Sequence, residues 1–343
     1  MSTDLVADLK RCERKVFLDE PTSFHALNHL AKTIGGPELY IKRDDMGPLA
    51  FGGNKLRQLE FYFGDAVARG ADTILITGAV QSNFVRLAAA CAAKLGMHCH
   101  IQLEERVSKM DVNYRNSGNV LLNQILGATL HSYPAGEDER GADLNLEKLA
   151  LNVREQGGIP YVIHLSSDYP SIGALGYVAG AIELAQQIQS KNITLSAIVL
   201  PSGSGATHAG MLYGMRALGI STPIIGACVR RSASEQIHRI RTHCDSMARQ
   251  LRQTNPVGTD DIILNEKFLA PGYGRAGAHA NEAIKLSARL EGIILDPVYS
   301  AKSFACFIDY ARRNINGDPL LFLHTGGLPA IFAYQDDMLA AVS

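Results

Sequence analysis

The hydrophobic pattern of the chain alternates between short apolar runs, which predict strands, and apolar residues at helical spacing, which predict helices. Short apolar runs of strand length occupy residues 39–43, 73–79 and 99–104. Between them, residues 55–70 and 84–96 carry apolar side chains at helical spacing. The alternation continues with a helix over 119–128, a strand over 128–134, a helix over 144–158 and a strand over 160–165. Strands separated by helices in this order are typical of a parallel sheet.

A second set of elements follows a long amphipathic helix that is predicted over residues 174–190. Strands are expected at 197–201, 223–229 and 319–324, and helices at 207–219, 283–292 and 302–313. The pattern implies two α/β units, with the chain crossing between them near residues 165–180. The stretch 230–274 is polar and irregular, and its pattern predicts no particular element.

Length and charge narrow the class of protein further. The chain has 343 residues, of which 46% are hydrophobic, so it can bury a large core and is expected to form two domains. Lysine and arginine total 33 against 34 acidic residues, with no long basic block, so we expect no nucleic acid or anionic membrane as a partner. A small molecule is the expected ligand. An N-terminus without an apolar signal core, and the absence of any apolar run of membrane-spanning length, predict a soluble, cytoplasmic protein.

The cysteines and histidines give no metal-binding pattern. Six cysteines are scattered without a Cys-x-x-Cys pair, as expected for reduced thiols in a cytosol. The triplet His98-Cys99-His100 falls in a predicted strand, where alternate side chains point to opposite faces. Only the two histidines could share a metal, and no further ligand is evident nearby. We therefore interpret this segment as an ordinary strand.

The first candidate site is Lys55, where a glycine-bearing loop, Phe51-Gly52-Gly53-Asn54, leads into a helix. The positive end of the helix and partial burial both disfavour the ammonium form, which leaves a nucleophilic amine suited to Schiff-base chemistry with an aldehyde. Taken alone the signal is weak, because many lysines at helix starts are simply solvated.

The second candidate site is a run of small residues between a strand and a helix: Ser202, Gly203, Ser204, Gly205, Ala206 and Thr207. Here successive N–H groups, the helix N-terminus and hydroxyl groups can converge on a phosphate. The run matches neither a P-loop nor the dinucleotide fingerprint. The alternative is a plain small-residue turn.

The third candidate site, residues 77–83, also follows a strand and precedes a helix. Backbone N–H groups and the Ser82 hydroxyl can hold a carboxylate, and Asn83 can bond a cofactor oxygen; a helix N-cap is the alternative. Near the C-terminus, residues 295–300 and 323–327 repeat the pattern of a strand followed by small residues. Several such loops at strand carboxyl ends predict one cleft.

Taken together, these motifs resemble the D-cysteine desulfhydrase and 1-aminocyclopropane-1-carboxylate (ACC) deaminase family, and lie closer to the desulfhydrases. The matching segments include IKRDDMGPLAFGGNKLRQLEF, GAVQSN, GALGYV, SGSGATHAG, FLAPGYG, ARLEGIILDPVYSAK and LFLHTGGLPAIFAY, in order from about residue 20 to residue 335. The resemblance implies a fold-type II enzyme dependent on pyridoxal 5'-phosphate (PLP). Such an enzyme is an α/β protein with two open, twisted, mainly parallel sheets flanked by helices and an active site in the cleft between domains.

The resemblance also implies the domain limits, the assembly and the role of each site residue. Residues 1–52 plus 176–343 would form the large PLP-binding domain and 53–175 the small one, in a homodimer. Lys55 would be the Schiff-base lysine and the acid/base group. Ser82 would hold the substrate carboxylate, beside Asn83 and Phe84. The remaining roles fall to tyrosines at the substrate, Tyr273 and Tyr299, and to cofactor-binding residues: Asn54, Asn83, residues 202–207, and Ser300 and Thr325 near the pyridine nitrogen.

Ser300 distinguishes between the chemistries of the family. ACC deaminases carry a glutamate at this position, and a carboxylate there keeps the pyridine nitrogen protonated for ring opening. D-cysteine desulfhydrases carry a threonine, which Ser300 resembles. We therefore expect elimination of a β-substituent such as sulfide from a small amino acid, giving pyruvate and ammonia. The alternatives are ACC deamination, elimination from another β-substituted amino acid such as cysteate, or PLP binding without turnover.

Departures from the family pattern lie on the expected substrate side. Phe84 and Leu87 replace polar side chains, and Ser167-Asp168-Tyr169-Pro170 stands where relatives carry a Gly-Gly-Ser-Asn loop. If that loop faces the substrate, the pocket has changed in shape and charge. The identity of the amino acid is then open.

Overall fold

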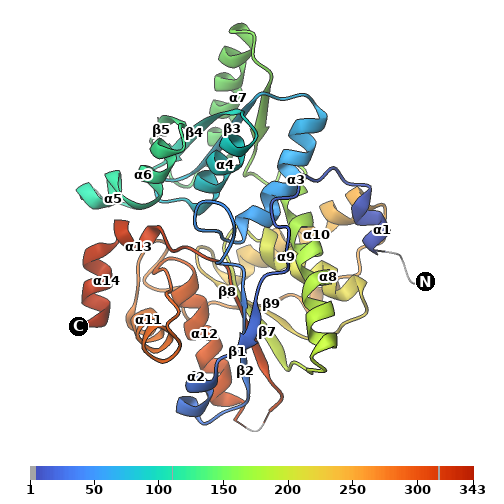
Figure 1. Cartoon of the computed structure of the whole chain (residues 1–343), viewed down its shortest axis with the longest axis vertical. Helices are drawn as coiled ribbons and strands as arrows, with labels where there is room; N and C mark the ends of the chain where they lie inside the picture. The colour runs from blue at the N-terminus through green and yellow to red at the C-terminus, as the bar shows by residue number, and fades with distance from the viewer. Residues whose placement is uncertain (1–4, 110, 316) are drawn as a thin grey trace.

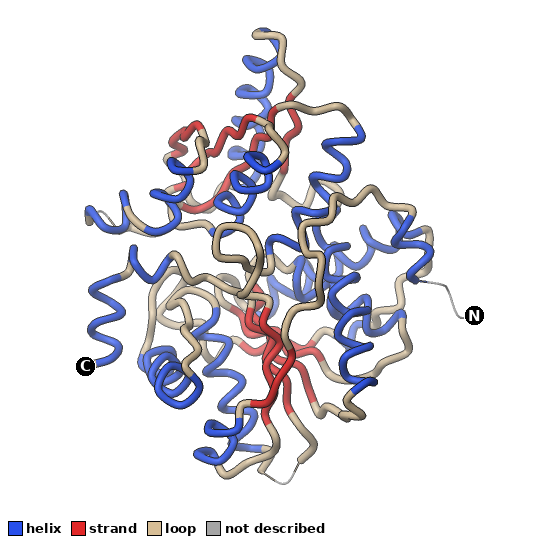
Figure 2. The backbone as a smooth tube through the Cα atoms, in the orientation of Figure 1, coloured by secondary structure: helices blue, strands red, loops and turns tan. Residues whose placement is uncertain are grey.

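Two separate sheets organise the computed structural model, which describes residues 5–109, 111–315 and 317–343. Residues 1–4, part of the N-terminal segment considered above, lie outside it. The larger sheet has the order β1-β2-β10-β7-β8-β9 and the smaller one β5-β4-β3-β6. All neighbouring strands are parallel except β1 and β2. In Figure 1 the smaller sheet lies above the larger one, and in Figure 2 loops gather between the two.

The strands and helices occupy the following bounds. The larger sheet consists of β1 (Phe24–Ala26), β2 (Leu39–Arg43), β7 (Ala197–Ser202), β8 (Ile224–Cys228), β9 (Ile263–Asn265) and β10 (Leu320–His324). The smaller sheet consists of β3 (Thr73–Ala79), β4 (His98–Glu104), β5 (Thr129–Tyr133) and β6 (Pro160–Ile163). The helices are α1 (Leu5–Lys10), α2 (Asn28–Ile34), α3 (Lys55–Ala68), α4 (Asn83–Lys94), α5 (Val112–Asn116), α6 (Gly118–Ile125), α7 (Glu139–Glu155), α8 (Leu175–Ser190), α9 (Ala206–Ala217), α10 (Ala233–Leu251), α11 (Ala278–Glu291), α12 (Ser300–Arg313), α13 (Ala330–Ala333) and α14 (Gln335–Val342). Two 3₁₀ turns, η1 (Ile172–Ala174) and η2 (Thr259–Asp261), complete the list.

The predicted fold class and the predicted strands and helices are confirmed, with one long helix missed. Helix α10 lies inside the stretch 230–274, for which the pattern predicted no element. Its buried positions include Ile240, Met247 and Leu251, so the apolar face is narrow and polar residues dominate the helix. Ser232 and Glu235 form a capping box at its start, and this was the available sequence signal.

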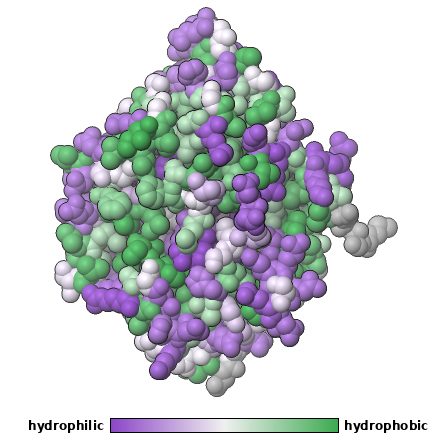
Figure 3. Space-filling view, in the orientation of Figure 1, coloured by the Kyte–Doolittle hydropathy of each residue, from purple (hydrophilic) through white to green (hydrophobic). Residues whose placement is uncertain are grey.

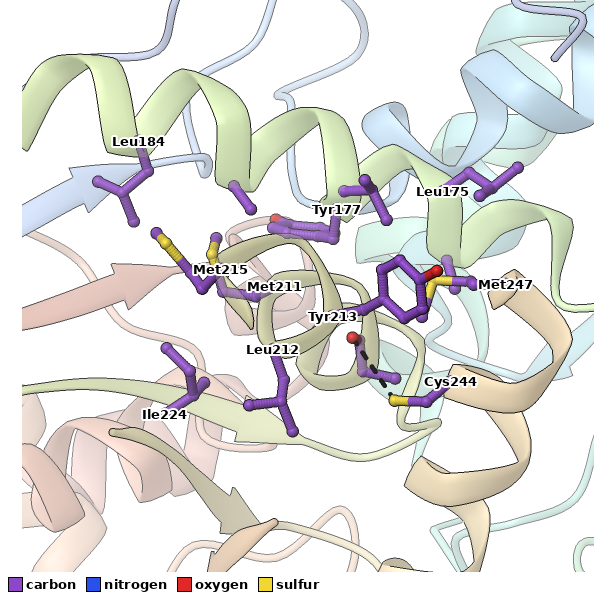
Figure 4. Packing of buried hydrophobic residues seen from close by; sticks show 14 of the residues in the cluster. Leu175, Tyr177, Leu184, Met211, Leu212, Tyr213, Met215, Ile224, Cys244 and Met247 are labelled. Carbon is purple, nitrogen blue, oxygen red and sulfur yellow. Dashed lines mark hydrogen bonds between the residues drawn. The ribbon is translucent and has the colours of Figure 1, made fainter. Parts of the chain in front are cut away.

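Helices cover both faces of the larger sheet. On one face α8, α9 and α10 pack together through side chains such as Tyr177, Leu212 and Met247, and Figure 4 shows this cluster from close by. On the other face α2, α11 and α12 pack against the strands through Phe304, Phe307 and neighbouring residues. Strands buried on both faces account for the continuous apolar runs seen in the sequence.

The smaller sheet is covered by α3 and α4 on one side and by α7 on the other. His98, Cys99 and His100 lie in β4, with Cys99 buried and His98 exposed, as an ordinary strand would place them. In the part of the chain that the structure describes, no helix is long and apolar enough to cross a membrane. The face seen in Figure 3 mixes polar and apolar side chains.

A buried ion network fixes the start of α3 against the larger sheet and α8. Arg57 donates to Asp44 at 2.8 and 3.0 Å, and to Glu183 at 2.8 and 2.9 Å. Lys42 pairs with Glu183, and the Tyr177 hydroxyl donates to Asp44 at 2.7 Å. Burial alone would raise the pKa of Asp44, but the Arg57 charge lowers it below its usual value. The network therefore holds its charges fully paired.

Removing the arginine from this network should destabilise the fold. Arg57→Met leaves Asp44 buried beside an apolar side chain, and we expect the free energy of unfolding to fall by about 3–5 kcal/mol. Urea denaturation measures the change. Arg69→Met is the matched control, because Arg69 forms an exposed ion pair with Asp65 on the same helix and should cost about 0.5 kcal/mol or less. Equal losses in the two variants would contradict the proposed importance of the network.

Candidate active site

The loops at the carboxyl ends of strands from both sheets line one cavity. Twelve of the predicted site residues face it: Asn54, Lys55, Ser82, Asn83, Phe84, Gly203, Ser204, Gly205, Thr207, Tyr273, Tyr299 and Thr325. They come from the segments that follow β2, β3, β7, β9 and β10 and from the segment before α12. Residues far apart in the sequence thus converge where the ends of parallel strands meet, as the sequence predicted.

Lys55 is the first residue of α3, and its amine opens onto the cavity. The Nζ atom donates to Gln58 Oε1 at 3.1 Å, lies 3.5 Å from Ser204 Oγ and stands 4.9 Å from the centre of the Phe84 ring. Burial, assisted by the charge of Arg239, lowers the pKa of Lys55 to about 8. A much larger fraction of the amine is therefore neutral near physiological pH than for an ordinary lysine, and the neutral form can act as a nucleophile.

The loop before Lys55 is shaped by two glycines in left-handed conformations, Gly52 at φ 61° and Gly53 at φ 124°. Arg86 donates to the Gly52 carbonyl at 2.7 Å, and the Asn54 N–H donates to the Thr325 carbonyl at 2.9 Å. The loop is thereby fastened to α4 on one side and to the end of β10 on the other. This arrangement holds Lys55 at the junction of the two sheets.

In the small-residue loop after β7 the carbonyl groups are turned away from the cavity. The Gly203 carbonyl accepts from Arg231 at 3.1 Å and from Gln236 at 3.2 Å. The Ser204 carbonyl accepts from Arg239 at 2.7 Å and lies 3.0 Å from His243 Nε2. Among the described residues, none accepts a hydrogen bond from the N–H groups of 203–205. The N–H groups of this loop are therefore free to donate hydrogen bonds to a bound anion.

Two further side chains have donors available at the cavity. The Thr207 hydroxyl accepts from Asn54 at 2.8 Å and from Gln58 at 2.9 Å, which leaves its own proton to donate. Asn83 Oδ1 accepts from Asn119 at 3.1 Å, which turns the amide N–H₂ of Asn83 to the opposite side. Ser82 is also the N-cap of α4, since its hydroxyl oxygen accepts from Phe84 N at 3.2 Å and Val85 N at 3.4 Å. A capping serine keeps its hydroxyl proton free for a ligand.

Tyr273 and Tyr299 form a hydrogen-bonded pair through their hydroxyls. Burial, followed by the neighbouring Tyr273, raises the pKa of Tyr299 above its ordinary value. Lys302 donates to the carbonyls of Leu269 and Gly272, at 2.7 and 2.6 Å, and so fixes the loop that carries Tyr273. The pair places two adjacent hydroxyls at the cavity wall.

Three of the predicted cofactor residues do not line the cavity. Ser300 is fully buried, where its hydroxyl donates to Asp296 Oδ1 at 2.6 Å and accepts from Asp296 N at 2.7 Å. Ser202 is buried too, and its hydroxyl contacts His208 and Gln236. Ala206 opens α9 behind the loop. Both hydroxyls are used within the protein, one to brace the start of α12 and the other to hold the base of the small-residue loop.

Most of the residues that depart from the family pattern also lie outside the cavity. Residues 167–170 line a separate surface hollow beside α10, where Asp168 pairs with Arg140 at 2.8 Å. Leu87 is fully buried in the core of the smaller unit. Phe84 and Leu165 are the side chains from these segments that do reach the cavity. Residues 167–170 and Leu87 therefore do not meet the condition for a changed pocket, whereas Phe84 does.

Two arginines at the cavity were missed in the sequence, Arg106 and Arg230. Each stands two residues beyond the end of a strand, β4 and β8 respectively. The rule that ligands bind at strand carboxyl ends would have found both.

Nearby, Glu139 is the first residue of α7 and accepts from Arg230, Arg231 and Arg239 at 2.6–2.8 Å. Burial would raise the pKa of Glu139, but these arginines, led by Arg239, lower it to about 2.

The fold and site define a class of PLP enzyme, and comparison with known proteins agrees. Residues 17–326 match the family described as pyridoxal-phosphate dependent enzyme, and the chain belongs to that family. It is 43% identical to D-cysteine desulfhydrase of Salmonella typhimurium over 95% of this chain and 98% of that protein. Among solved structures, an ACC deaminase homologue has a TM-score of 0.87 at 32% identity, covering 99% of this chain and 100% of the other. A fungal L-serine ammonia-lyase from Rhizomucor miehei, at 19% identity and a TM-score of 0.64 over 93% and 98% of the chains, shares the fold.

The residues at the cavity fit the cofactor of this family. A neutral amine at Lys55 suits the aldehyde of PLP, and the N–H groups of 203–205 with the Thr207 hydroxyl suit its phosphate. The chain is accordingly a PLP-dependent lyase of this family.

Crowding the small-residue loop should weaken retention of the cofactor. A Cβ at Gly205, which has φ 93°, would lie 3.0 Å from the His243 ring and would push it from the Ser204 carbonyl. We expect Gly205→Ala to raise the Kd for PLP by about tenfold or more, since the loop donors lose their alignment. Gly219→Ala is the matched control, because φ there is 76° with no atom within 4 Å of the added Cβ. Equal PLP occupancy of the two variants after dialysis would refute the assignment.

The lowered pKa of Lys55 predicts how covalent capture of PLP depends on pH. The neutral amine is the reacting form, and its fraction rises through a pKa of about 8 instead of the ordinary 10.5. The rate at which apoprotein captures PLP should therefore increase with pH to a midpoint near 8 and then level off. Stopped-flow absorbance measures this rate, with Lys55→Ala as the blank. A midpoint close to that of free lysine would show that the amine is not desolvated.

Proposed function

We propose that this lyase removes the β-substituent from a small, D-cysteine-like amino acid and releases pyruvate, ammonia and the leaving group, such as sulfide. The observation that carries the proposal is the Lys55 amine, held between a phosphate-type loop and a tyrosine pair in one cavity. The 43% identity to D-cysteine desulfhydrase over nearly the whole chain supports the same reaction.

Bound PLP supplies an electron sink for the α-carbon of the substrate. The residues of the chain supply the rest. Lys55 would hold the cofactor through its amine and would serve as the base that accepts the α-proton. Residues 203–207 would bind the phosphate, with Asn54 supporting Thr207 by a hydrogen bond to its hydroxyl. Asn83 and Thr325, which line the same cavity, would contribute to holding the rest of the cofactor.

The substrate is held from the other side. Ser82 and the N–H groups at the start of α4 hold the carboxylate, where the helix N-terminus favours negative charge. Phe84 packs beside the Lys55 amine and closes the cavity to water on that side. Tyr273 and Tyr299 orient the β-substituent and pass a proton to it as it leaves.

The second candidate is ACC deamination, which the ACC deaminase homologue would suggest. Ring opening requires a strongly protonated pyridine, and we propose that this chain does not provide it. At position 300 a serine stands in place of a carboxylate, with its hydroxyl proton directed to Asp296. Its replacement by glutamate would bury a second charge beside Asp296, so the wild-type protein is the better subject for a test.

We further propose a cytoplasmic homodimer in which residues 1–52 plus 176–343 and residues 53–175 are the two domains. Exposed apolar side chains on neighbouring helices support self-association: Val112, Leu121, Ile125, Phe332 and Leu339. They come from α5, α6, α13 and α14, of which α13 contacts both α5 and α6. An apolar patch shared by adjacent elements is what a two-fold interface requires.

A panel of amino acids tests the reaction. Wild-type protein should release pyruvate from β-chloroalanine and D-cysteine faster than 2-oxobutyrate from ACC. Lys55→Ala should lower kcat by about 10³-fold or more and abolish the visible absorbance of bound PLP, since both the attachment point and the base are lost. Faster release of 2-oxobutyrate from ACC would favour the second candidate. Bound PLP without any keto acid would point to a binding protein without turnover.

A further inference from the structure

Arg106 and Arg230 face the cavity from different sheets and are not used by the reaction proposed above. Arg106 follows β4 of the smaller sheet and Arg230 follows β8 of the larger one. Their side chains are only 7% and 6% exposed. The polar atoms of a buried side chain usually have hydrogen-bond partners within the protein or in ordered water.

Neither arginine is fully matched within the described residues. Arg106 Nε donates to Glu104 at 2.8 Å, whereas the buried Nη2, although it lies 2.7 Å from the same oxygen, has no hydrogen-bond acceptor among them. Arg230 donates through Nη1 to Glu139 at 2.8 Å and through Nη2 to Glu137 at 2.7 Å. Its Nε is buried without an acceptor in the described part of the chain. Donors of this kind are costly to bury unless a ligand accepts from them.

The charges around this wall favour an anion. Arg106, Arg230, Arg231 and Arg239 face two buried carboxylates, Glu104 and Glu139, while Glu137 is 68% exposed at the rim. Arg231 and Arg239 already donate to the carbonyls of the small-residue loop. Four arginines against three carboxylates leave this wall of the cavity with a net positive charge.

The two arginines line the same cavity as the tyrosine pair. Burial raises the pKa of Tyr299, and the positive charge of Arg106 opposes that rise. Burial opposes the raised pKa of Arg230, which comes mainly from Glu137 and Glu139, with a smaller contribution from Tyr273. The Lys55 amine, by contrast, is influenced by Arg239. The tyrosine pair is where the β-substituent was placed in the proposed reaction.

We propose that Arg106 and Arg230 select an amino acid whose β-substituent carries a fixed negative charge, with a sulfonate as the best match. Planar guanidinium groups bind such oxyanions through charge-assisted hydrogen bonds. This deepens the proposed function and rests on it. In the reaction the α-proton passes to Lys55, the Cβ–S bond breaks and its electron pair leaves with sulfite. The resulting enamine takes up one water to give pyruvate and ammonia.

A comparison of substrates tests the proposed selection. The kcat/KM of the holoenzyme is measured for both enantiomers of cysteate, for D-cysteine and for β-chloroalanine by the release of pyruvate, and for cysteate also by the release of sulfite. We expect one cysteate enantiomer to exceed β-chloroalanine by about tenfold or more. Arg106→Gln and Arg230→Gln should each lower the cysteate to β-chloroalanine ratio by about 30-fold, and Arg106→Lys should restore part of it. Arg140→Gln, at an exposed arginine outside the cavity, should keep the wild-type ratio.

Binding gives a readout independent of turnover, which also serves if the glutamine variants fail to fold. Calorimetry with wild-type holoenzyme should show tighter binding of 3-sulfopropionate than of propionate, by about tenfold, and the difference should shrink with added salt.

The outcomes separate the two proposals. If the glutamine variants lose the same factor in kcat/KM for substrates with anionic and with neutral β-substituents, the arginines act on the α-carboxylate that all these substrates share. That result would overturn the proposed selection. A wild-type preference for β-chloroalanine, or equal binding of the two analogues, would also overturn it while the elimination reaction stands. Release of no pyruvate from any substrate would overturn the proposed function, and the selection with it.

Discussion

The pairing of Arg57 with Asp44 and Glu183 is the constraint on which the placement of the site depends. Arg57 lies two residues after Lys55, on the side of α3 that faces the larger unit. Helix α8 comes so close to α3 that a Cβ at Gly176 would lie 2.1 Å from the Arg57 carbonyl. These contacts fix the first turn of α3 against α8 and the larger sheet. Because Lys55 belongs to that turn, its backbone is held at the edge of the cavity that it lines.

The phosphate-type loop depends on a second layer of contacts in the same manner. Its glycine and serine residues make a turn possible, but they do not determine which way the peptide groups face. That direction comes from α10, whose Gln236, Arg239 and His243 hold the carbonyls on the outer side. The donors of the loop are left for a ligand because the acceptors are satisfied elsewhere. A mostly polar helix thus contributes to the site without reaching it.

The sequence predicted most of the fold and the centre of the site, for identifiable physical reasons. Periodicity found the strands that are buried on both faces, and the rule for strand carboxyl ends brought Lys55, Ser82 and Gly203 together. It failed at α10, where the apolar face is narrow and polar side chains serve the neighbouring loop. It did not show the surroundings of Ser300, because no sequence pattern shows that its hydroxyl will donate to Asp296 four residues earlier. Partners of this local kind are decided by rotamers that only the packed structure fixes.

Glu139 bridges the two halves of the molecule, since α7 packs on the smaller sheet and its three arginine partners follow β8 or lie on α10. Charges that are 6–17% exposed are poorly screened by salt and cannot be separated without rehydration. Wide opening of the molecule would have to break all three pairs at once. Movement of single loops, in contrast, would leave all three pairs of Glu139 intact.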